Sequence, residues 1–186
     1  MKLVFVRHGE PDYEHDCLTE TGIKQAEATA LRLEKEGIIE IYASPNGRAQ
    51  QTATFTADRL RHKVNTLDFM HEITWGDPDD PDFPHNGHPW ELANEMAEGD
   101  YLFIRDNWRE HPYFRTNLAT ACYDFVSARL DSFLETQGYR REGNRYLCIS
   151  DDTDRTIAMF GHGGSGACML AHMLNIPFPQ FCQAFP

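Results

Sequence analysis

Short apolar runs alternate with segments of helical periodicity along much of this 186-residue chain. Residues 2–6 and 38–43 are short and rich in β-branched or aromatic side chains, which is typical of buried strands. A third strand is expected over 64–67. Strands that alternate with helices form a mainly parallel sheet covered on both faces. The sequence therefore predicts an α/β fold with three layers, α/β/α.

Two helices are expected between these strands. In the first, apolar residues recur at helical spacing over 23–33, after Thr19, which is a suitable N-cap residue. The second has a strong start signal, Ser44 followed by Pro45, because a proline at the first helical position loses no hydrogen bond. We expect this second helix to begin at that pair and to run to about Leu60.

The second half of the chain begins with a long loop, GDPDDPDFPHNGHP, whose proline, aspartate and glycine content argues against a core element. The elements expected after it are helices over 90–107 and 116–137, a strand pair over 145–149 and 155–160 joined by the turn SDDTD, and a last helix ending near Asn175. No internal repeat is present, and one domain over 1–186 is predicted, with an insertion at about 76–112 that sets specificity. The chain ends on the apolar segment PQFCQAFP, and we expect either a truncation here or the start of a further element.

Composition and charge exclude several classes of protein. The formal net charge of −12 argues against a nucleic-acid-binding protein, which needs a basic surface. No apolar run approaches the roughly 18 residues of a membrane span, and no signal-peptide pattern opens the chain, so we expect a cytoplasmic protein that does not bind membranes. Five cysteines without a CxxC pair argue against a disulfide framework or a structural zinc site.

Two of the expected strands end in histidine and glycine, as VFVRHG and IAMFGHGG. In open α/β sheets, ligands bind outside the carboxyl ends of the strands. If the two strands are neighbours, His8 and His162 face each other in one crevice. Gly163 would let the backbone approach a ligand closely, and the N–H groups at the start of the last helix would favour an anion.

A third contribution to this crevice comes from ASPNGRAQQTA. Arg48 is expected in the first turn of its helix, where the helix dipole disfavours a cation by a few tenths of a kcal/mol to about 1 kcal/mol. An arginine at that position makes sense if an anion binds between it and the helix N-terminus. With Arg7, it would provide two guanidinium groups that suit phosphate, and a neutral imidazole could attack the phosphorus atom.

Four motifs make a resemblance specific: RHGE at 7–10, LTETGIKQA at 18–26, SPNGRAQQTA at 44–53 and GHGG at 161–164. In order and spacing they resemble the histidine phosphatase superfamily, which has the phosphoglycerate mutase-like fold. The resemblance extends from residue 2 to about residue 175.

The resemblance implies a role for each matching residue. His8 matches the histidine that becomes phosphorylated, and Arg7 and Arg48 match the residues that clamp the phosphate. His162 matches the second histidine, which binds phosphate and stabilises the transition state. No metal ion or cofactor is implied.

Members of the family also use an acidic residue to protonate the leaving oxygen. The stretch FMHEITWGD at 69–77 resembles the segment that carries this acid in the phosphatase branches, which makes Glu72 the candidate. Asp77 and Asp12 are the alternatives. A glutamate that acts as an acid near neutral pH needs a raised pKa.

The chain also departs from the family pattern. Pro11 stands where the family often has threonine, Glu14 stands at an asparagine position, and PDDPD replaces a WEG-like continuation. The basic insertions of the mutases are not matched. The sequence thus predicts a metal-independent phosphomonoesterase that acts on a small phosphorylated metabolite through a phosphohistidine. The alternatives are phosphoglycerate mutase-type transfer and a non-catalytic module that binds a phosphorylated ligand; the oligomeric state is left open.

Overall fold

The computed structural model describes residues 1–151 and 154–185, which form two compact units. The first unit comprises Met1–Glu72 and Cys148–Gly166, and the second comprises Ile73–Leu147 and Ala167–Pro186. One domain over 1–186, with an insertion at about 76–112, stays a prediction. Among the described residues, none of the helices combines the length and apolar character that crossing a membrane requires.

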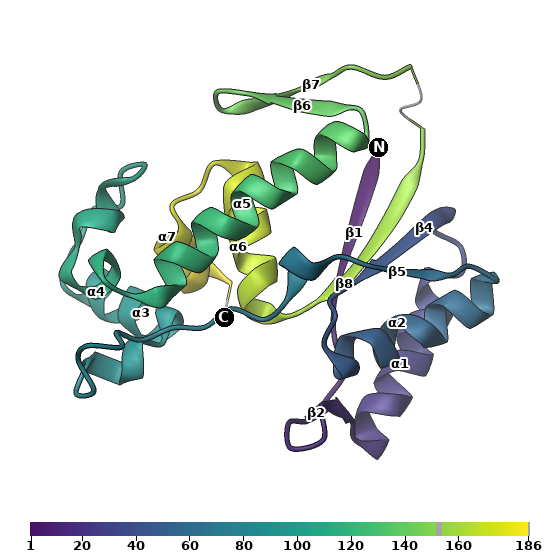
Figure 1. The fold of residues 1–186 in the computed structure, drawn as a ribbon, viewed down its shortest axis with the longest axis horizontal. Helices are drawn as coiled ribbons and strands as arrows, with labels where there is room; N and C mark the ends of the chain where they lie inside the picture. Colours follow the sequence, from purple (N-terminus) through teal and green to yellow (C-terminus); the bar gives the residue numbers. More distant parts are fainter. Residues whose placement is uncertain (152–153, 186) are drawn as a thin grey trace. The chain divides into compact units, whose positions relative to one another are not determined.

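The first unit is built on a four-stranded sheet in the order β1-β8-β4-β5 (Figure 1). The strands are β1 (Lys2–Arg7), β4 (Ile38–Ala43), β5 (Val64–Thr66) and β8 (Thr156–Gly161), and each neighbouring pair is parallel. The predicted mainly parallel sheet is confirmed, and the three strands expected in the first part of the chain lie within one or two residues of their predicted bounds.

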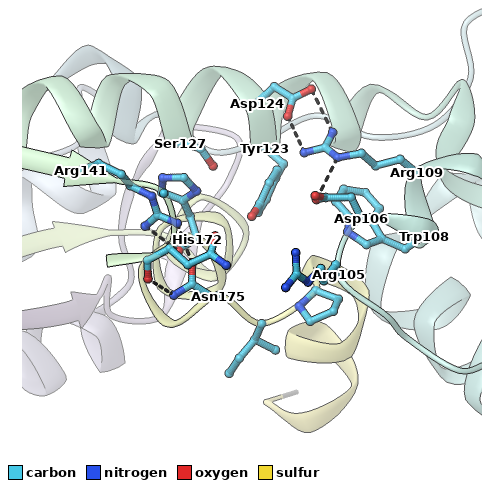
Figure 2. A pocket seen from close by; sticks show the side chains of 14 residues that line it. Arg105, Asp106, Trp108, Arg109, Tyr123, Asp124, Ser127, Arg141, His172 and Asn175 are labelled. Carbon is cyan, nitrogen blue, oxygen red and sulfur yellow. Dashed lines mark hydrogen bonds and ion pairs between the residues drawn. The ribbon is translucent and has the colours of Figure 1, made fainter. Parts of the chain in front are cut away.

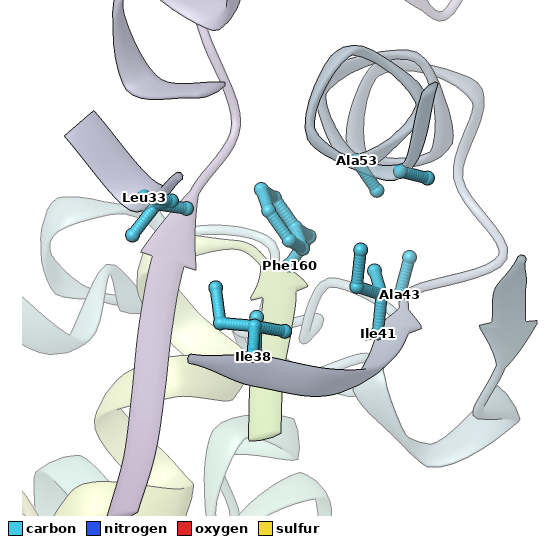
Figure 3. Packing of buried hydrophobic residues seen from close by; sticks show 8 residues of the cluster. Leu33, Ile38, Ile41, Ala43, Ala53 and Phe160 are labelled. Carbon is cyan, nitrogen blue, oxygen red and sulfur yellow. The ribbon is translucent and has the colours of Figure 1, made fainter. Parts of the chain in front are cut away.

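Helices α1 (Glu20–Leu33) and α2 (Gly47–Leu60) supply apolar side chains to one face of this sheet. Figure 3 shows the resulting cluster, in which Phe160 of β8 lies among side chains from both helices and from β4. Val4 and Val6 of β1 pack against the same cluster. Phe5 alternates to the opposite face, where a Cβ on Gly166 of α6 (Gly163–Leu174) would lie 2.4 Å from its ring. Helical residues therefore lie on both faces, as the expected α/β/α order requires.

Of the two helix starts predicted from the sequence, that of α1 is confirmed and that of α2 is wrong. The Thr19 side chain accepts a hydrogen bond from the Gly22 N–H, which confirms it as the N-cap of α1. The predicted start of α2 at Ser44 and Pro45 is wrong, since that helix begins at Gly47 with Asn46 as its N-cap residue. The Ser44 hydroxyl contacts His162 and Asn46 and does not cap the helix.

The predicted pairing of strands 145–149 and 155–160 is also wrong. Strand β7 (Arg145–Cys148) pairs with β6 (Tyr139–Glu142) in a separate hairpin, whereas β8 joins the parallel sheet between β1 and β4. Gly143 has φ of +60° at the turn of the hairpin, so the Gly143-Asn144 dipeptide supplies the left-handed conformation that a tight turn needs. In the expected turn SDDTD, Asp152 and Thr153 lie outside the described residues.

The second unit contains most of the remaining helices. Helix α3 ends at Glu98 and not at Asn107 as predicted, because Asp100 has a left-handed backbone with φ of +57°. The other elements are β2 (Pro11–Asp12) and β3 (Cys17–Leu18), both in the first unit, 3-10 helices η1 (Asp68–Met70, in the first unit), η2 (Pro84–Gly87) and η3 (Asn107–Glu110), and helices α3 (Pro89–Glu98), α4 (Pro112–Arg115), α5 (Leu118–Thr136) and α7 (Phe178–Ala184). The core of the second unit is aromatic: the Trp108 ring contacts Phe114, Tyr123 and Phe178 at centroid distances of 5.5–6.0 Å.

Candidate active site

Two histidines meet at the carboxyl edge of the sheet in the first unit. Strands β1 and β8 are parallel neighbours with Arg7 opposite Gly161, so the residues that follow them, His8 and His162, lie side by side. Their ring centroids are 5.1 Å apart. Both side chains are buried, with exposed fractions of 9% for His8 and 0% for His162.

A backbone carbonyl fixes the protonation of His8. Its Nδ1 lies 2.7 Å from the Gly9 carbonyl oxygen, and since a carbonyl only accepts hydrogen bonds, Nδ1 carries the proton. In the neutral ring, Nε2 then has a free lone pair. Burial is the largest cause that lowers the pKa of His8, and the charges of Arg48 and Arg7 lower it further, against the opposing effect of the Gly9 hydrogen bond. The ring is therefore neutral near pH 7 and suited to nucleophilic attack through Nε2.

Only one ring nitrogen of His162 has a hydrogen-bond partner among the described residues. Its Nε2 lies 2.7 Å from the Ser44 hydroxyl, whereas Nδ1 is buried and has no hydrogen-bond partner among the described residues. Burial is the main cause that lowers the pKa of His162 to about 3, and the nearby charge of Arg48 adds to it. The single Ser44 hydroxyl proton has two acceptors, Asn46 Oδ1 at 3.2 Å and His162 Nε2 at 2.7 Å. When it goes to the nearer one, Nε2, Nδ1 of the neutral ring bears a proton and can donate to a bound anion.

Arg48 lies in the first turn of α2, as predicted, and its side chain is buried. Its Nε donates to His8 Nε2 at 3.4 Å. The Asp16 carboxylate accepts hydrogen bonds from Arg48 Nη1 and, at 2.6 Å, from the Gly47 N–H. The anion that the sequence predicts at this helix N-terminus is thus supplied, in the free protein, by the chain itself.

The Asp16 carboxylate is held in its ionised form. Burial alone would raise the pKa of Asp16, but the hydrogen bonds from the Gly47 N–H and from Arg48 outweigh it and lower the pKa. Asp16 also adopts φ of +48°, a left-handed backbone that is uncommon outside glycine but tolerated by aspartate. The local chain conformation thus turns this carboxylate toward α2.

The second predicted arginine, Arg7, is exposed and has no ion-pair partner among the described residues. A Cβ on Gly163 would lie 3.5 Å from its guanidinium carbon, so the guanidinium packs against the first residue of α6. The structure therefore places a free cation beside a helix N-terminus, next to the two histidines. This combination suits the oxygen atoms of a phosphate group.

Hydrogen bonds join the first three sequence motifs into one scaffold. The Gly9 N–H donates to the Thr52 hydroxyl at 3.1 Å, and that hydroxyl donates to the Arg48 carbonyl at 2.8 Å. On the other side, the Thr19 hydroxyl donates to the Glu10 carboxylate at 2.7 Å. The segment RHGE is thus attached to the starts of both α1 and α2.

Glu72, the predicted acid, lies at the carboxyl end of the first segment of this unit. Its carboxylate accepts the Ser165 N–H at 3.1 Å, in the first turn of α6. Its own N–H donates to the Asn46 side chain at 3.4 Å. The charge of Glu72 also acts on His8, whose pKa it raises in opposition to burial. Glu72 therefore lies close enough to His8 for its charge to act on that ring, and it is attached to the first turn of α6.

The alternative acids have less suitable surroundings. The His15 side chain hydrogen-bonds Asp12 and lowers the pKa of this carboxyl. A hydrogen bond from Thr116 lowers the pKa of Asp77, which belongs to the second unit. A proton donor near neutral pH needs the opposite shift. Asp12 and Asp77 are therefore unsuited to this role.

Several residues of the site were not predicted to be functional. Ser44 and Thr52 lie within the motif SPNGRAQQTA, but Ser44 was assigned to a helix cap and Thr52 had no role. Asp16 and Ser165 carried no local signal, because their partners are 31 and 93 positions away. Among the described residues, no group of three or more His, Cys, Asp or Glu side chains is arranged to hold a metal ion.

Comparison with known proteins shows which family this chain matches. The family model of the histidine phosphatase superfamily (branch 1) matches residues 3–184. Among curated proteins, the probable phosphoglycerate mutase GpmB of Yersinia pestis is 34% identical over 85 residues, which cover 41% of this chain and 40% of that protein. The match therefore spans less than half of that relative.

Two solved structures show the same fold. The mycobacterial glucosyl-3-phosphoglycerate phosphatase, in its native form, is 25% identical with a TM-score of 0.56, over 97% of this chain and 82% of that chain. The phosphoserine phosphatase of Entamoeba histolytica, in complex with 3-phosphoglyceric acid, is 21% identical with a TM-score of 0.61, over 99% of this chain and 84% of that chain.

Replacing Asp16 tests whether its carboxylate competes with anions for Arg48. We expect Asp16→Asn to tighten the binding of inorganic phosphate, measured by calorimetry, up to about fivefold, because an ion pair worth up to about 1 kcal/mol no longer has to be broken. Asp12→Asn is the matched control, since it removes the same charge from the same loop without contacting Arg48. Weaker phosphate binding by Asp16→Asn would show that Asp16 instead holds Arg48 in its binding position.

Acid should destabilise the fold through His162. The pKa of this group is about 3 in the folded protein and about 6.5 in the unfolded chain, so between these values the unfolded chain binds more protons and stability falls as the pH falls. The expected loss from His162 is about 2 kcal/mol between pH 7 and pH 5, measured by urea denaturation. His162→Gln should remove most of this loss, whereas His15→Gln, on the surface, should not. An unchanged pH dependence in His162→Gln would contradict the assignment.

Proposed function

The chain belongs to the histidine phosphatase superfamily, and we propose that it hydrolyses phosphate monoesters of small metabolites through a phosphohistidine at His8, without a metal ion. The observation that carries this proposal is the orientation of His8. Its Nδ1 is occupied by the Gly9 carbonyl, and its Nε2 faces Arg48 Nε at 3.4 Å. A neutral imidazole beside a cation that can hold phosphate oxygens is the arrangement that attack on phosphorus needs.

In the first step, His8 Nε2 attacks the phosphorus atom while the bond from phosphorus to the leaving oxygen breaks. Arg7, Arg48 and the Nδ1–H of His162 stabilise the charge on the three remaining phosphate oxygens. To engage these oxygens, Arg48 exchanges the Asp16 carboxylate for the phosphate and also gives up its hydrogen bond to His8 Nε2, which frees the lone pair that attacks. Glu72, protonated, gives its proton to the leaving oxygen, which departs as an alcohol.

In the second step, a water molecule attacks the phosphorus atom of the phosphohistidine, and the bond from His8 Nε2 to phosphorus breaks. Glu72, now ionised, accepts the proton that the water loses. Inorganic phosphate leaves and the Asp16 carboxylate returns to Arg48. The same charges therefore stabilise both transition states, and Glu72 regains the proton that it gave up.

Phosphoglycerate mutase-type transfer is the second candidate, and the similarity to the probable phosphoglycerate mutase GpmB supports it. In that reaction the phosphohistidine returns its phosphoryl group to the substrate and not to water. The chain lacks the basic insertions of the mutases, which favours hydrolysis. A phosphorylated metabolite of the size of a sugar or glycerate phosphate suits either reaction, as the name of the mycobacterial glucosyl-3-phosphoglycerate phosphatase suggests.

The nucleophile is tested with p-nitrophenyl phosphate, from pH 5 to pH 8 and with EDTA present. We expect turnover by the wild type to survive chelation and to fall about 10³-fold or more in His8→Ala. His15→Ala, a surface histidine of the same segment, should retain full activity. The wild type should also carry an acid-labile phosphoryl group after quenching, and His8→Ala should not. Phosphate binding without turnover would support a non-catalytic module, and isomerised phosphoglycerate without free phosphate would support the mutase.

The acid is tested with two substrates that differ in the basicity of the leaving group. Glu72→Gln should lower kcat/KM for phenyl phosphate about 10²-fold or more, because phenolate needs a proton as it leaves. The loss for p-nitrophenyl phosphate should be much smaller, since p-nitrophenolate is a far weaker base. Asp12→Asn and Asp77→Asn should change kcat/KM by the same factor for both substrates. An equal loss for both substrates in Glu72→Gln would remove Glu72 from the role of acid.

A further inference from the structure

The second unit contains a cavity of about 370 Å³ that shares no residue with the candidate active site. It is bounded by α5, by η3 and the residues before it, by the turn of the β6–β7 hairpin, and by the end of α6 with the loop that follows (Figure 2). A volume of this size is within the range of small-molecule sites, which is about 300 to 1,000 Å³. The question is which ligand its side chains would recognise.

Three arginines and two carboxylates line the cavity, and one of the arginines, Arg109, forms ion pairs with both carboxylates. Arg109 donates to Asp124 through both terminal nitrogens, at 2.7 and 3.1 Å, and its Nε donates to Asp106 at 3.4 Å. It also lies over the Trp108 ring, 4.6 Å from the centroid. This ion-pair group carries one negative charge in excess and forms a wall of the cavity, whose three arginines and two aspartates together leave a net charge of +1.

Arg141 is held rigidly by neutral acceptors. It donates to the His172 carbonyl at 3.2 Å and to the Asn175 side chain at 2.6 Å, and its guanidinium lies 5.0 Å from the centroid of the Tyr146 ring. Asp131 accepts hydrogen bonds from His172 and Tyr146, and no carboxylate among the described residues forms an ion pair with Arg141. Arg141 therefore has a fixed position and no direct ion pair, and the Asp131 carboxylate reaches it only through Tyr146 and His172.

Arg105 is an exposed arginine at the mouth of the cavity. Figure 2 shows its side chain reaching toward the Tyr123 side chain, and within the described part of the chain it forms no ion pair or hydrogen bond. Its backbone is left-handed, with φ of +47°. On a protein with a net charge of −12, anions are repelled overall, so a concavity whose lining has more arginines than carboxylates is a local exception.

The remaining walls provide a donor and an apolar surface. The Tyr123 hydroxyl stays protonated because burial raises its pKa, so it can donate a hydrogen bond. Ile176 and Pro177 line the cavity with apolar atoms. The lining is thus predominantly polar, and Ile176 and Pro177 provide a smaller apolar area beside it.

We propose that this cavity binds a small organic anion, whose oxyanion group is held by Arg105, Arg141 and the Tyr123 hydroxyl and whose apolar part packs on Ile176 and Pro177. Arg141 is already fixed by its neighbours, so binding an anion there costs little side-chain entropy. The site is independent of the proposed phosphatase reaction, since none of its residues belongs to the catalytic group.

Two probes with the same apolar part distinguish the oxyanion that the cavity prefers: phenylphosphonate and benzoate. Their binding is measured by calorimetry in the Arg48→Gln protein, in which the candidate active site is weakened as an anion site. We expect at least one probe to bind, and Arg141→Gln in that protein to weaken it about fivefold or more. Arg140→Gln is the matched control, because the neighbouring Arg140 pairs with Glu142 and does not line the cavity; it should leave the affinity unchanged.

Arg105→Gln removes the other cation without breaking any contact within the described structure, so it decides the question even if Arg141→Gln does not fold. It should also weaken the binding of the probe about fivefold or more. The proposal is overturned if neither probe binds in the Arg48→Gln protein, if Arg105→Gln leaves the affinity unchanged, or if Arg140→Gln weakens binding as much as Arg141→Gln.

Discussion

The backbone of Gly9 is the point on which the candidate site depends. A Cβ at this position would lie 2.6 Å from the Gly22 carbonyl oxygen, and a Cβ on Gly22 would lie 2.2 Å from the Glu10 carbonyl oxygen. Only glycine at both positions allows the loop after β1 to lie directly on the start of α1. In that position the Gly9 N–H reaches Thr52, and the Gly9 carbonyl reaches His8 Nδ1. One close contact between two backbones thus decides which nitrogen of His8 is free.

Burial then determines the charge state of the site. His8, His162 and Arg48 are all nearly inaccessible to water, and burial disfavours a charge on either imidazole. Arginine keeps its charge under the same conditions, so the site separates into a fixed cation and two neutral rings. A chain with an acidic surface can therefore bind an anion at this place, since the positive charge is concentrated where the phosphate would lie.

Much of this arrangement could be predicted from the sequence. The strand pattern placed His8 and His162 at one edge of the sheet, because the rule for parallel strands needs only the two apolar runs that precede them. Ser44 was misassigned because a serine before a proline gives the same local signal whether its hydroxyl caps a helix or binds a histidine 118 positions away. The hairpin of β6 and β7 was missed although Gly143-Asn144 is a turn signal, since the apolar run that forms β8 suggested a different partner for β7. Asp16 could not have been found, because only the folded chain brings it to Arg48.

In the free protein Arg48 is already paired with the Asp16 carboxylate, which an incoming anion has to displace. An incoming ligand gains only the difference between its own attraction to Arg48 and that of the carboxylate it displaces. A carboxylate ligand offers the same chemical group and one charge, so this exchange gives it little advantage. A phosphate monoester brings up to two charges and three oxygens, which can reach Arg7 and His162 as well as Arg48. If the site binds phosphate esters as we propose, the Asp16 carboxylate would therefore favour dianions over monoanions.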